Sequence, residues 1–414
     1  MMFPRTLHRR VVDLLSTMPV VYLQGARQVG KTTLARQLIQ AGIMKHYFSF
    51  DDPAVLSAAG QDPVGFVRTL PLHTVLDEVQ RAPAIMPLLK MRVDAHREAG
   101  DLLLTGSANP LMLPHLSETL VGRMAVITLM PLSQGEIEGE EDSWLERVFS
   151  NGLSTGNFPP PHDLLSRVVR GGYPEAVLCS EPRHRTDWLL SYVDTLLARD
   201  VREIADIERL TEVPRLLQLL AAQACQTLNV ANLSRETGIP QSTLQRYLAL
   251  LETLFLLVRI PAWYTSVGKR LLKSPKILLN DTGLACALLG CDEERLARDP
   301  LLQGRLVENF VGTELLKQIG FSSRRLRLHH FRTDRGEEVD FVIEDAQGTL
   351  VGIEVKPGAT VHSEHFKGLR SLQKLAGNRF VCGIVLYRGE HTLSFGEGLW
   401  AQPISALWTA VSTG

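Results

Sequence analysis

Gly25-Ala-Arg-Gln-Val-Gly-Lys-Thr32 is the stretch that decides the fold of the first part of this chain of 414 residues. It has the pattern G-x-x-x-x-G-K-T, which is typical of the loop that wraps the phosphates of a nucleoside triphosphate. The apolar run Pro19–Leu23 before it predicts a buried strand, and Thr33–Ile39 after it predicts a helix. Glycines let backbone N–H groups turn toward phosphate oxygens, and a helix N-terminus adds partial positive charge. The sequence therefore predicts a phosphate-binding loop.

Two side chains of this loop have specific predicted roles. Lys31 is expected to reach the β- and γ-phosphates, and the Thr32 hydroxyl is expected to ligate Mg²⁺. ATP and Mg²⁺ are therefore the expected cofactors. An ordinary Gly-rich turn is the alternative, which the flanking strand and helix patterns disfavour. The residues predicted to contact the nucleotide are Gly25, Ala26, Arg27, Gln28, Val29, Gly30, Lys31, Thr32 and Thr33.

Length and composition limit the class of protein. The length suggests two to three domains, and 45% hydrophobic with 21% charged residues is typical of a soluble globular protein. The net charge of −1 means that any contact with nucleic acid would need a local basic patch. The five cysteines form no C-x-x-C pair, which argues against a zinc ribbon or a disulfide framework. Without a recognisable secretory signal or membrane span, we expect a cytoplasmic protein with no membrane partner.

Residues 1–140 alternate short apolar runs with helical patterns. This alternation predicts a parallel sheet with helices on both faces. The expected strands are Val20–Gln24, Tyr47–Phe50, Val75–Asp77, Leu102–Thr105 and Val126–Leu129. The acidic stretch Glu136–Asp142 and the prolines 159–161 then predict a linker or insertion over residues 141–163.

Residues 164–290 are expected to be mostly helical and to contain a helix-turn-helix. Its first helix, Ala231–Thr237, ends at Gly238, and its second covers Gln241–Leu251. The apolar segments Phe255–Ile260 and Lys276–Leu279 are expected to form the strands of a wing. In such modules the start of the second helix reads base edges, although a lid or a protein contact is the alternative. The candidate contacts to DNA are Gln241, Ser242, Thr243, Gln245 and Arg246, flanked by Lys269, Arg270, Lys273 and Lys276.

A second and a third motif extend the predicted nucleotide site. Asp77 and Glu78 end an apolar strand, where Asp77 would hold Mg²⁺ through water and Glu78 would orient or deprotonate the attacking water. Thr105 and Ser107 end the next apolar strand and are expected to touch the γ-phosphate or the lytic water. A helix cap and a plain strand-to-loop turn are the respective alternatives.

Arginines can stabilise the charge that spreads during phosphoryl transfer. Arg123 is the candidate for a finger donated to a neighbouring subunit, and Arg81 is its rival. Each has an ordinary surface arginine as its alternative.

These motifs together resemble a family of prokaryotic AAA+-type ATPases. In that family, an ATPase core precedes a winged-helix segment and a C-terminal domain of uncharacterised function. The resemblance covers essentially the whole chain and rests on Gly25–Thr32, Asp77–Arg81, Thr105–Ser107, Gly122-Arg123 and Gly171–Glu175.

Residues 291–414 are expected to form a separate α/β domain that resembles the PD-(D/E)xK nuclease core. The resemblance implies that Asp340 and Glu354, on adjacent strands, bind Mg²⁺ and that Glu308 completes the site. Lys356, two residues after Glu354, would lie on the same side of the strand and polarise a water. Val339 stands where that core often has a proline. Many domains of this fold bind or scaffold without cleaving, and this alternative stays open.

Other charged residues of this region have weaker predicted roles. A basic strip could meet phosphates and would then give salt-dependent binding; it consists of Arg324, Arg325, Arg327, Arg332 and Arg335. Packing or surface positions are expected for His329, His330, His362 and His365.

The sequence as a whole favours a Mg²⁺-dependent ATPase that acts on or binds DNA. Two alternatives remain: an ATP-dependent switch or scaffold with an inactive nuclease-like domain, and an ATP-gated, metal-dependent DNA nuclease. A second copy of the chain or a different protein is a further possible partner.

Overall fold

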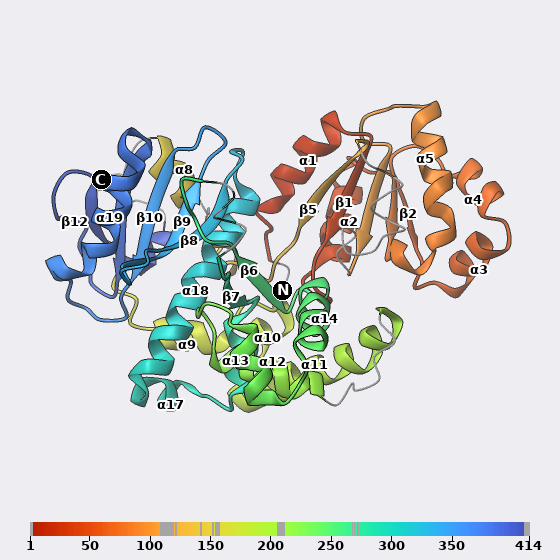
Figure 1. The fold of residues 1–414 in the computed structure, drawn as a ribbon. Coiled ribbons are helices and arrows are strands. Elements are labelled where there is room, and N and C mark those ends of the chain that lie inside the picture. Colours follow the sequence, from red (N-terminus) through yellow and green to blue (C-terminus); the bar gives the residue numbers. More distant parts are fainter. Residues whose placement is uncertain are drawn as a thin grey trace. The chain divides into compact units, whose positions relative to one another are not determined.

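The computed structural model describes residues 3–107, 120, 122–140, 143–150, 153, 158–204, 212–266, 268, 270 and 273–409. The chain divides into two compact units. The N-terminal unit contains residues 5–131 and 251–256, and the C-terminal unit contains residues 1–4, 132–250 and 257–414. Each unit is described by itself below, with element labels as in Figure 1.

The N-terminal unit is built on five parallel strands in its described residues, in the order β2-β3-β4-β1-β5. All five predicted strands are confirmed, with ends shifted by at most two residues. They are β1 (Val20–Gln24), β2 (His46–Ser49), β3 (Thr74–Asp77), β4 (Leu102–Gly106) and β5 (Met124–Thr128). Their near-continuous apolar sequences are typical of parallel strands that are buried on both faces.

Helices cover both faces of this sheet (Figure 1). Tyr22 of β1 lies in one apolar cluster with residues such as Val67 and Leu89 from the helices of one face. Val21 and Leu23 point the other way by the period of two and are also fully buried. The helices are α1 (Leu7–Thr17), α2 (Lys31–Gln40), α3 (Pro53–Gln61), α4 (Pro63–Thr69) and α5 (Met86–Ala95), with the short turns η1 (Val79–Arg81) and η2 (Pro83–Ile85).

A mixed sheet of six strands, in the order β12-β13-β11-β10-β9-β8, forms one part of the C-terminal unit. Phe366, Leu369 and Leu372 pack in one apolar cluster with Val342 and Val385 of the sheet. The described part of residues 291–414 contains both helices and strands, as expected for an α/β region. The elements are α18 (Pro300–Phe321), β8 (Arg327–Arg332), β9 (Glu338–Glu344), β10 (Leu350–Val355), η4 (Ser363–Phe366), α19 (Lys367–Ala376), η5 (Gly377–Arg379), β11 (Phe380–Tyr387), β12 (Leu393–Ser394), β13 (Leu399–Pro403) and η6 (Ile404–Leu407).

The rest of the C-terminal unit is mostly helical, as predicted. The predicted helix-turn-helix segments form α13 and α14, and α13 ends at Gly238, whose φ of 74° is left-handed. Two antiparallel strands, β6 and β7, follow where the wing was expected. The elements are α7 (Gln134–Glu138), α8 (Trp144–Ser150), α9 (Leu164–Arg170), α10 (Pro174–Leu178), α11 (Pro182–Ile204), α12 (Glu212–Ala222), α13 (Val230–Thr237), α14 (Gln241–Thr253), β6 (Leu257–Ile260), β7 (Lys276–Leu279), α16 (Thr282–Leu288) and α17 (Glu293–Arg298).

The acidic stretch and the predicted linker contain packed helices in the residues that the structure describes. Ser133 and Glu136 form a capping box that starts α7, and Glu136 is buried. In α8, inside the predicted linker, Trp144 and Leu145 are buried, and Trp144 Nε1 donates to Gln402 Oε1 at 2.8 Å. The pattern Ser133-x-x-Glu136 is a local signature of a capping box, which the acidic composition of the stretch obscured. The predicted domain boundaries at residues 140, 163 and 290 stay predictions.

The Gly171–Glu175 motif has a packing role in the C-terminal unit. Gly172 N donates to the buried Asp281 Oδ2 at 2.7 Å, and Gly172 O accepts from Leu132 N at 2.7 Å. A Cβ on Gly172 would lie 2.3 Å from Leu132 O, and one on Gly171 would lie 2.3 Å from Asp281 Oδ1. The two glycines therefore permit close contact between α9–α10 and the start of α16.

We expect Gly172→Ala to destabilise the C-terminal unit. Because the obstacle is a backbone carbonyl that cannot rotate away, the cost should be about 2 kcal/mol or more, which corresponds to about 4–8 °C in Tm. Differential scanning calorimetry measures this shift. Gly358→Ala is the matched control, since its Cβ would meet no atom within 4 Å. Equal Tm values for the two variants would contradict the packing role.

Candidate functional site

The loop between β1 and α2 has the backbone conformation that the motif predicts. Gly25 has a φ of 152°, and a Cβ there would lie 2.2 Å from Leu129 O. Gly30 has a φ of 101°, which L side chains rarely adopt. Neither glycine can be replaced without moving the loop.

Lys31 opens α2 and lies inside this loop. Its side chain is buried, and Nζ donates to Gly25 O and Ala26 O at 2.9 Å each. Its ammonium group is thus held against loop backbone, close to where the predicted phosphates would bind. Arg5, which the sequence analysis did not single out, supports the loop from behind, with bonds to Val29 O at 2.6 Å and Met130 O at 2.7 Å.

The acidic pair lies at the same edge of the sheet as the loop. Asp77 ends β3 and accepts hydrogen bonds from Thr32 Oγ1 at 2.9 Å and from Thr105 Oγ1. Since β3, β4 and β1 are neighbours and parallel, their carboxyl ends meet at one edge, where ligands of open α/β sheets bind. The structure therefore brings together three of the predicted residues, from three motifs.

Glu78 is held separately from Asp77. Its φ of 58° is left-handed, which is uncommon for a residue with a side chain. Its backbone N donates to Thr105 Oγ1 at 3.1 Å, and its Oε2 accepts from Ser107 Oγ at 3.1 Å. The turn after β3 thus directs the two adjacent carboxylates to different partners, so that one can serve a metal and the other a water.

Two further residues at this edge were missed. Tyr47 OH donates to Asp77 Oδ2 at 2.6 Å, and burial together with this carboxylate raises the pKa of Tyr47 to about 12. Gln80 Nε2 donates to Glu78 Oε2 and, at 3.0 Å, to Ser107 Oγ. In the sequence, Tyr47 looks like an ordinary aromatic residue of a strand. The position of Gln80, two residues after the acidic pair, could have indicated that it lies at this site.

Both candidate arginine fingers are paired within the N-terminal unit. Arg123 Nη2 donates to Asp94 Oδ2 at 3.0 Å, and Arg81 Nη1 is paired with Asp51. The role of either arginine stays a prediction. Residues 108–119 and 121, next to Arg123, lie outside the described residues.

The oxygen donors at this edge suit Mg²⁺. Thr32 and Asp77 offer a hydroxyl and a carboxylate beside the phosphate loop, and Mg²⁺ in nucleotide sites takes one or two such groups together with phosphate oxygens and water. The residues present therefore fit the metal that the motif implies.

A second polar cluster lies in the C-terminal unit and contains the nuclease-like residues. Asp340 on β9 and Glu354 on β10 lie on adjacent antiparallel strands. Asp340 Oδ2 accepts from Val355 N at 2.9 Å, and Lys356 Nζ donates to Glu354 Oε1 at 2.8 Å. Glu308 faces this group from α18. The structure thus brings together the four residues that the resemblance named.

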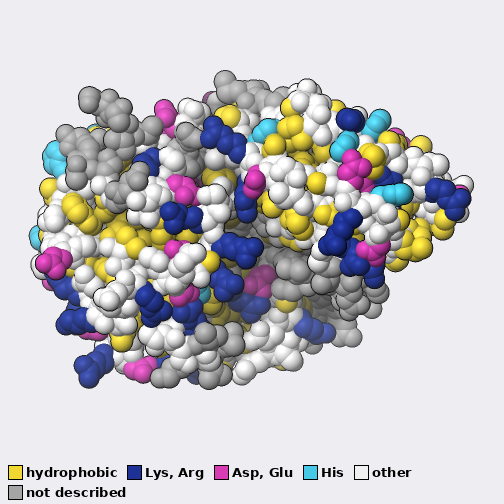
Figure 2. All heavy atoms as spheres, turned by 90° about the horizontal axis from the view of Figure 1, so that it is seen from above, with side chains coloured by type: hydrophobic (Ala, Val, Ile, Leu, Met, Phe, Trp, Pro, Cys, Tyr) yellow, Lys and Arg dark blue, Asp and Glu magenta, His cyan; other side chains and the backbone are white. Residues whose placement is uncertain are grey.

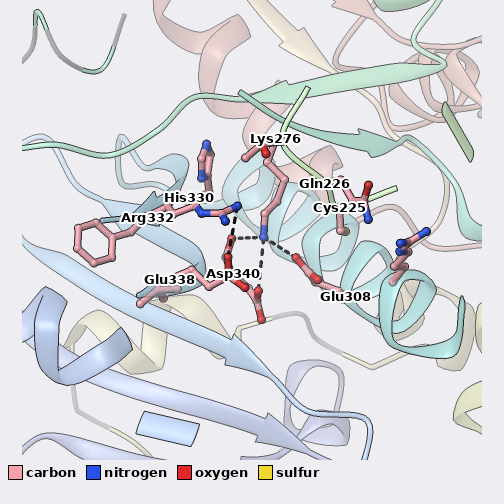
Figure 3. A pocket seen from close by; sticks show the side chains of 12 residues that line it. Cys225, Gln226, Lys276, Glu308, His330, Arg332, Glu338 and Asp340 are labelled. Atoms are coloured by element: carbon pink, nitrogen blue, oxygen red, sulfur yellow. Dashed lines mark hydrogen bonds and ion pairs between the residues drawn. The ribbon is translucent and has the colours of Figure 1, made fainter. Parts of the chain in front are cut away.

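Lys276 of β7 is also part of this cluster, where sequence reasoning had put it beside a DNA groove. Its side chain is buried, and Nζ donates to Glu308 Oε1 and, at 3.4 Å, to Asp340 Oδ1 (Figure 3). That expectation was wrong because strand β7 turns this lysine inward. Nothing local in the sequence separates it from Lys273, which is half-exposed and pairs with Asp334.

Burial shapes the charge of this cluster. Burial, together with the charge of Asp340, raises the pKa of Glu308 to about 8 and that of Glu354 to about 8. Burial acts to lower the pKa of Lys276, but the carboxylates of Glu308 and Asp340 outweigh it and raise that pKa.

The cluster borders a cavity of about 380 Å³. Polar and charged side chains dominate its wall. In Figure 3, Glu308 of α18 and Asp340 of β9 point toward the ammonium group of Lys276 on β7. Its lining residues are Cys225, Gln226, Thr227, Lys276, Arg305, Glu308, His330, Phe331, Arg332, Glu338, Val339 and Asp340.

The predicted metal set Glu308, Asp340 and Glu354 does not fit a metal ion. No group of three or more His, Cys, Asp or Glu among the described residues is arranged to hold one. An ammonium group lies between Glu308 and Asp340, and a second is bonded to Glu354.

The remaining candidates of this region are split between core and surface. His329 and His330 are buried, and burial lowers the pKa of each to about 4, so both are neutral packing residues at pH 7. His362 is exposed, as are four arginines of the predicted basic strip, whereas Arg324 is half-buried. On the face drawn in Figure 2, Lys and Arg side chains are scattered among Asp and Glu.

One family model matches most of the N-terminal unit. Residues 17–138 match the family model described as AAA domain. This part of the chain is therefore similar to AAA-type P-loop ATPase domains. Two further matches are to domains of unknown function, DUF8612 over residues 161–295 and DUF4143 over residues 303–407.

Relatives extend over nearly the whole chain. Uncharacterized proteins of Mycobacterium bovis and of Mycobacterium tuberculosis are each 29% identical over 409 residues, which covers 99% of this chain and 83% of each relative. An uncharacterized protein of Haemophilus influenzae is 25% identical over 292 residues, covering 67% of this chain and 64% of the relative.

Solved structures give weaker matches. The Walker-type ATPase of Pyrococcus abyssi is 16% identical with a TM-score of 0.43, covering 69% of this chain and 96% of that one. The RuvB Holliday junction branch migration motor of Thermotoga maritima is 17% identical with a TM-score of 0.30, covering 66% and 96%. In the described part of this chain, no helix combines the length and apolar character needed to cross a bilayer.

Proposed function

We propose that this protein binds and hydrolyses ATP with Mg²⁺ and couples this hydrolysis to acting on or binding DNA. The observation that carries the ATPase part is the separation of the two carboxylates: Asp77 accepts from Thr32, whereas Glu78 accepts from Ser107. When Mg²⁺ is bound it neutralises the charge of the phosphates.

Each residue of the N-terminal site has a proposed task. The loop amides and Lys31 bind the triphosphate, and Thr32 and Asp77 would hold the metal. Glu78 orients the attacking water or takes its proton, while Thr105 fixes the backbone of Glu78 through its bond to Glu78 N. Hydrolysis with and without several forms of DNA, for the wild type and for Glu78→Gln, tests this assignment.

The DNA part of the proposal is supported by the exposure pattern of α14. Gln241, Gln245 and Arg246 are exposed at its start, whereas Leu244 and Tyr247 are buried. An exposed polar face at the start of a second helix is the part that contacts bases and phosphates in helix-turn-helix modules.

We expect Arg246→Ala to raise the Kd for duplex DNA about 3- to 10-fold and to reduce the slope of log K against log salt by about one. Fluorescence anisotropy over a salt series measures both. Arg298→Ala is the control, because Arg298 is an exposed arginine on α17 of the same unit that pairs with Glu294. An unchanged Kd in Arg246→Ala would remove this helix from the proposal.

A second candidate function is an ATP-dependent switch or scaffold in which the nuclease-like domain does not cleave. The pairing of Glu308 and Asp340 with Lys276 favours it over an ATP-gated nuclease. A stable protein partner, together with ATP hydrolysis that DNA does not stimulate, would support this alternative.

Self-assembly with Arg123 as a finger toward a neighbouring copy, and a cytoplasmic location, stay part of the proposal.

A further inference from the structure

We propose that the Lys276 ammonium takes the place of a divalent cation in the carboxylate cluster of the C-terminal unit, so that this cluster binds no metal ion. The proposal is independent of ATP hydrolysis, since every residue in it lies outside the N-terminal unit.

The ammonium group of Lys276 has a hydrogen-bond acceptor for each of its N–H donors. Nζ donates to Glu308 Oε1, to Asp340 O at 3.2 Å and to Asp340 Oδ1 at 3.4 Å. A lysine ammonium has three N–H donors, and these three acceptors match that number. The same oxygens of Glu308 and Asp340 are those that a metal between them would need.

The two lysines of the cluster supply the positive charge that a metal ion would bring. Lys276 and Lys356 together bring two positive charges to Glu308, Asp340 and Glu354, the same charge that one Mg²⁺ would bring. Buried charges are tolerated when they are paired and hydrogen-bonded. A divalent cation added to this arrangement would face two ammonium groups at close range, with its carboxylate ligands already engaged.

Lys276 is held firmly in its position. It belongs to β7, which pairs with β6, and Thr227 bridges to Lys276 from the other side. Its ammonium also lies 5.2 Å from the centre of the Phe341 ring. The backbone of Lys276 is therefore fixed from both sides, and its long side chain is held in place by its hydrogen bonds and by the contact with Phe341.

The lysine comes from outside the nuclease-like motifs. Asp340, Glu354 and Lys356 lie on or directly after strands of the six-stranded sheet, whereas Lys276 belongs to the separate β6-β7 pair. The residue that neutralises the cluster thus reaches it from the segment that follows the helix-turn-helix. This explains why the motif by itself predicts a metal site that the assembled unit does not provide.

Binding of Mn²⁺ to the full-length protein without nucleotide tests the proposal. Electron paramagnetic resonance counts free Mn²⁺, and Asp340→Asn identifies binding at this cluster. In the wild type we expect no Asp340-dependent binding up to about 1 mM Mn²⁺. In Lys276→Ala we expect a new Mn²⁺ site whose Kd lies at least about tenfold below 1 mM. The double variant Lys276→Ala/Asp340→Asn should abolish this site.

Thermal unfolding gives a second measurement on the same proteins. Lys276→Ala should have a lower Tm, because it leaves buried carboxylates unpaired, and Mn²⁺ should restore part of the loss. The wild-type Tm should change no more with Mn²⁺ than that of Asp340→Asn. Lys273→Ala is the matched control, since Lys273 is a half-exposed lysine three residues away.

Two results would overturn the proposal. One is Asp340-dependent Mn²⁺ binding in the wild type as tight as in Lys276→Ala. The other is a folded Lys276→Ala that gains no Mn²⁺ site, because Lys276 would then not be what excludes the metal. If Lys276→Ala does not fold, Lys276→Met keeps the apolar stem and serves in its place, and the wild-type comparison with Asp340→Asn still decides.

Discussion

Lys31→Ala is expected to weaken ATP binding by about 100-fold or more, which corresponds to about 2.7 kcal/mol. The ammonium of Lys31 is buried in the loop and already held by Gly25 O and Ala26 O. Bound phosphates would gain a charge-assisted hydrogen bond from a group that loses little freedom on binding. Isothermal titration calorimetry with Mg²⁺ and ATP measures the change.

Lys45→Ala is the control for the loss of one positive charge. Lys45 is an exposed lysine of the same unit, so its removal should change the affinity by less than about twofold, because exposed charges are strongly screened. Unchanged thermal unfolding would show that Lys31→Ala is folded. A folded Lys31→Ala that binds ATP as tightly as the wild type would refute the assignment of the phosphate loop.

Glu78→Gln is expected to lower kcat for ATP hydrolysis by about 10²- to 10³-fold while it leaves the Kd for ATP within about threefold, because general-base catalysis contributes on that scale. Glutamine has nearly the same shape as glutamate, and its side-chain oxygen can still accept from Ser107. Only the negative charge that orients water or takes its proton is lost. Single-turnover hydrolysis and calorimetry separate the two effects.

Glu98→Gln provides the matched comparison. Glu98 is an exposed glutamate of the same unit that lies outside the edge formed by the loop, Asp77 and Glu78, so kcat should stay close to that of the wild type. If Glu78→Gln hydrolyses ATP at the wild-type rate, Glu78 has no catalytic role. If it loses ATP binding as well, its role is structural, through the left-handed turn after β3.

The two variants act at different steps and can therefore fail separately. Lys31→Ala is expected to lower the affinity for the triphosphate, whereas Glu78→Gln is expected to lower the rate of the hydrolysis that follows binding. Loss of binding in the first with loss of turnover alone in the second would be the pattern of a P-loop ATPase.

The errors of sequence reasoning share a cause. Tyr47 and Asp77 are 30 residues apart, and Arg5 and Met130 are 125 apart, so their contacts leave no local pattern. Glu136 is the exception, because Ser133 and Glu136 form the local S-x-x-E pattern of a capping box, which the acidic composition of the stretch obscured. The candidate residues that the structure brings together in the N-terminal unit, Thr32, Asp77 and Thr105, all belong to short motifs.

The amino-acid sequence by itself determined the five strands of the N-terminal sheet and the position of the phosphate loop between the first of them and the helix that follows. Both depend on local properties: apolar runs form buried strands, and glycines permit the left-handed turns of the loop. Only the tertiary structure decided that Lys276 lies among Glu308 and Asp340, because side chains 32 and 64 residues apart meet through the packing of β7, α18 and β9. Whether a set of carboxylates can take a metal depends on which cation the fold has already brought to them.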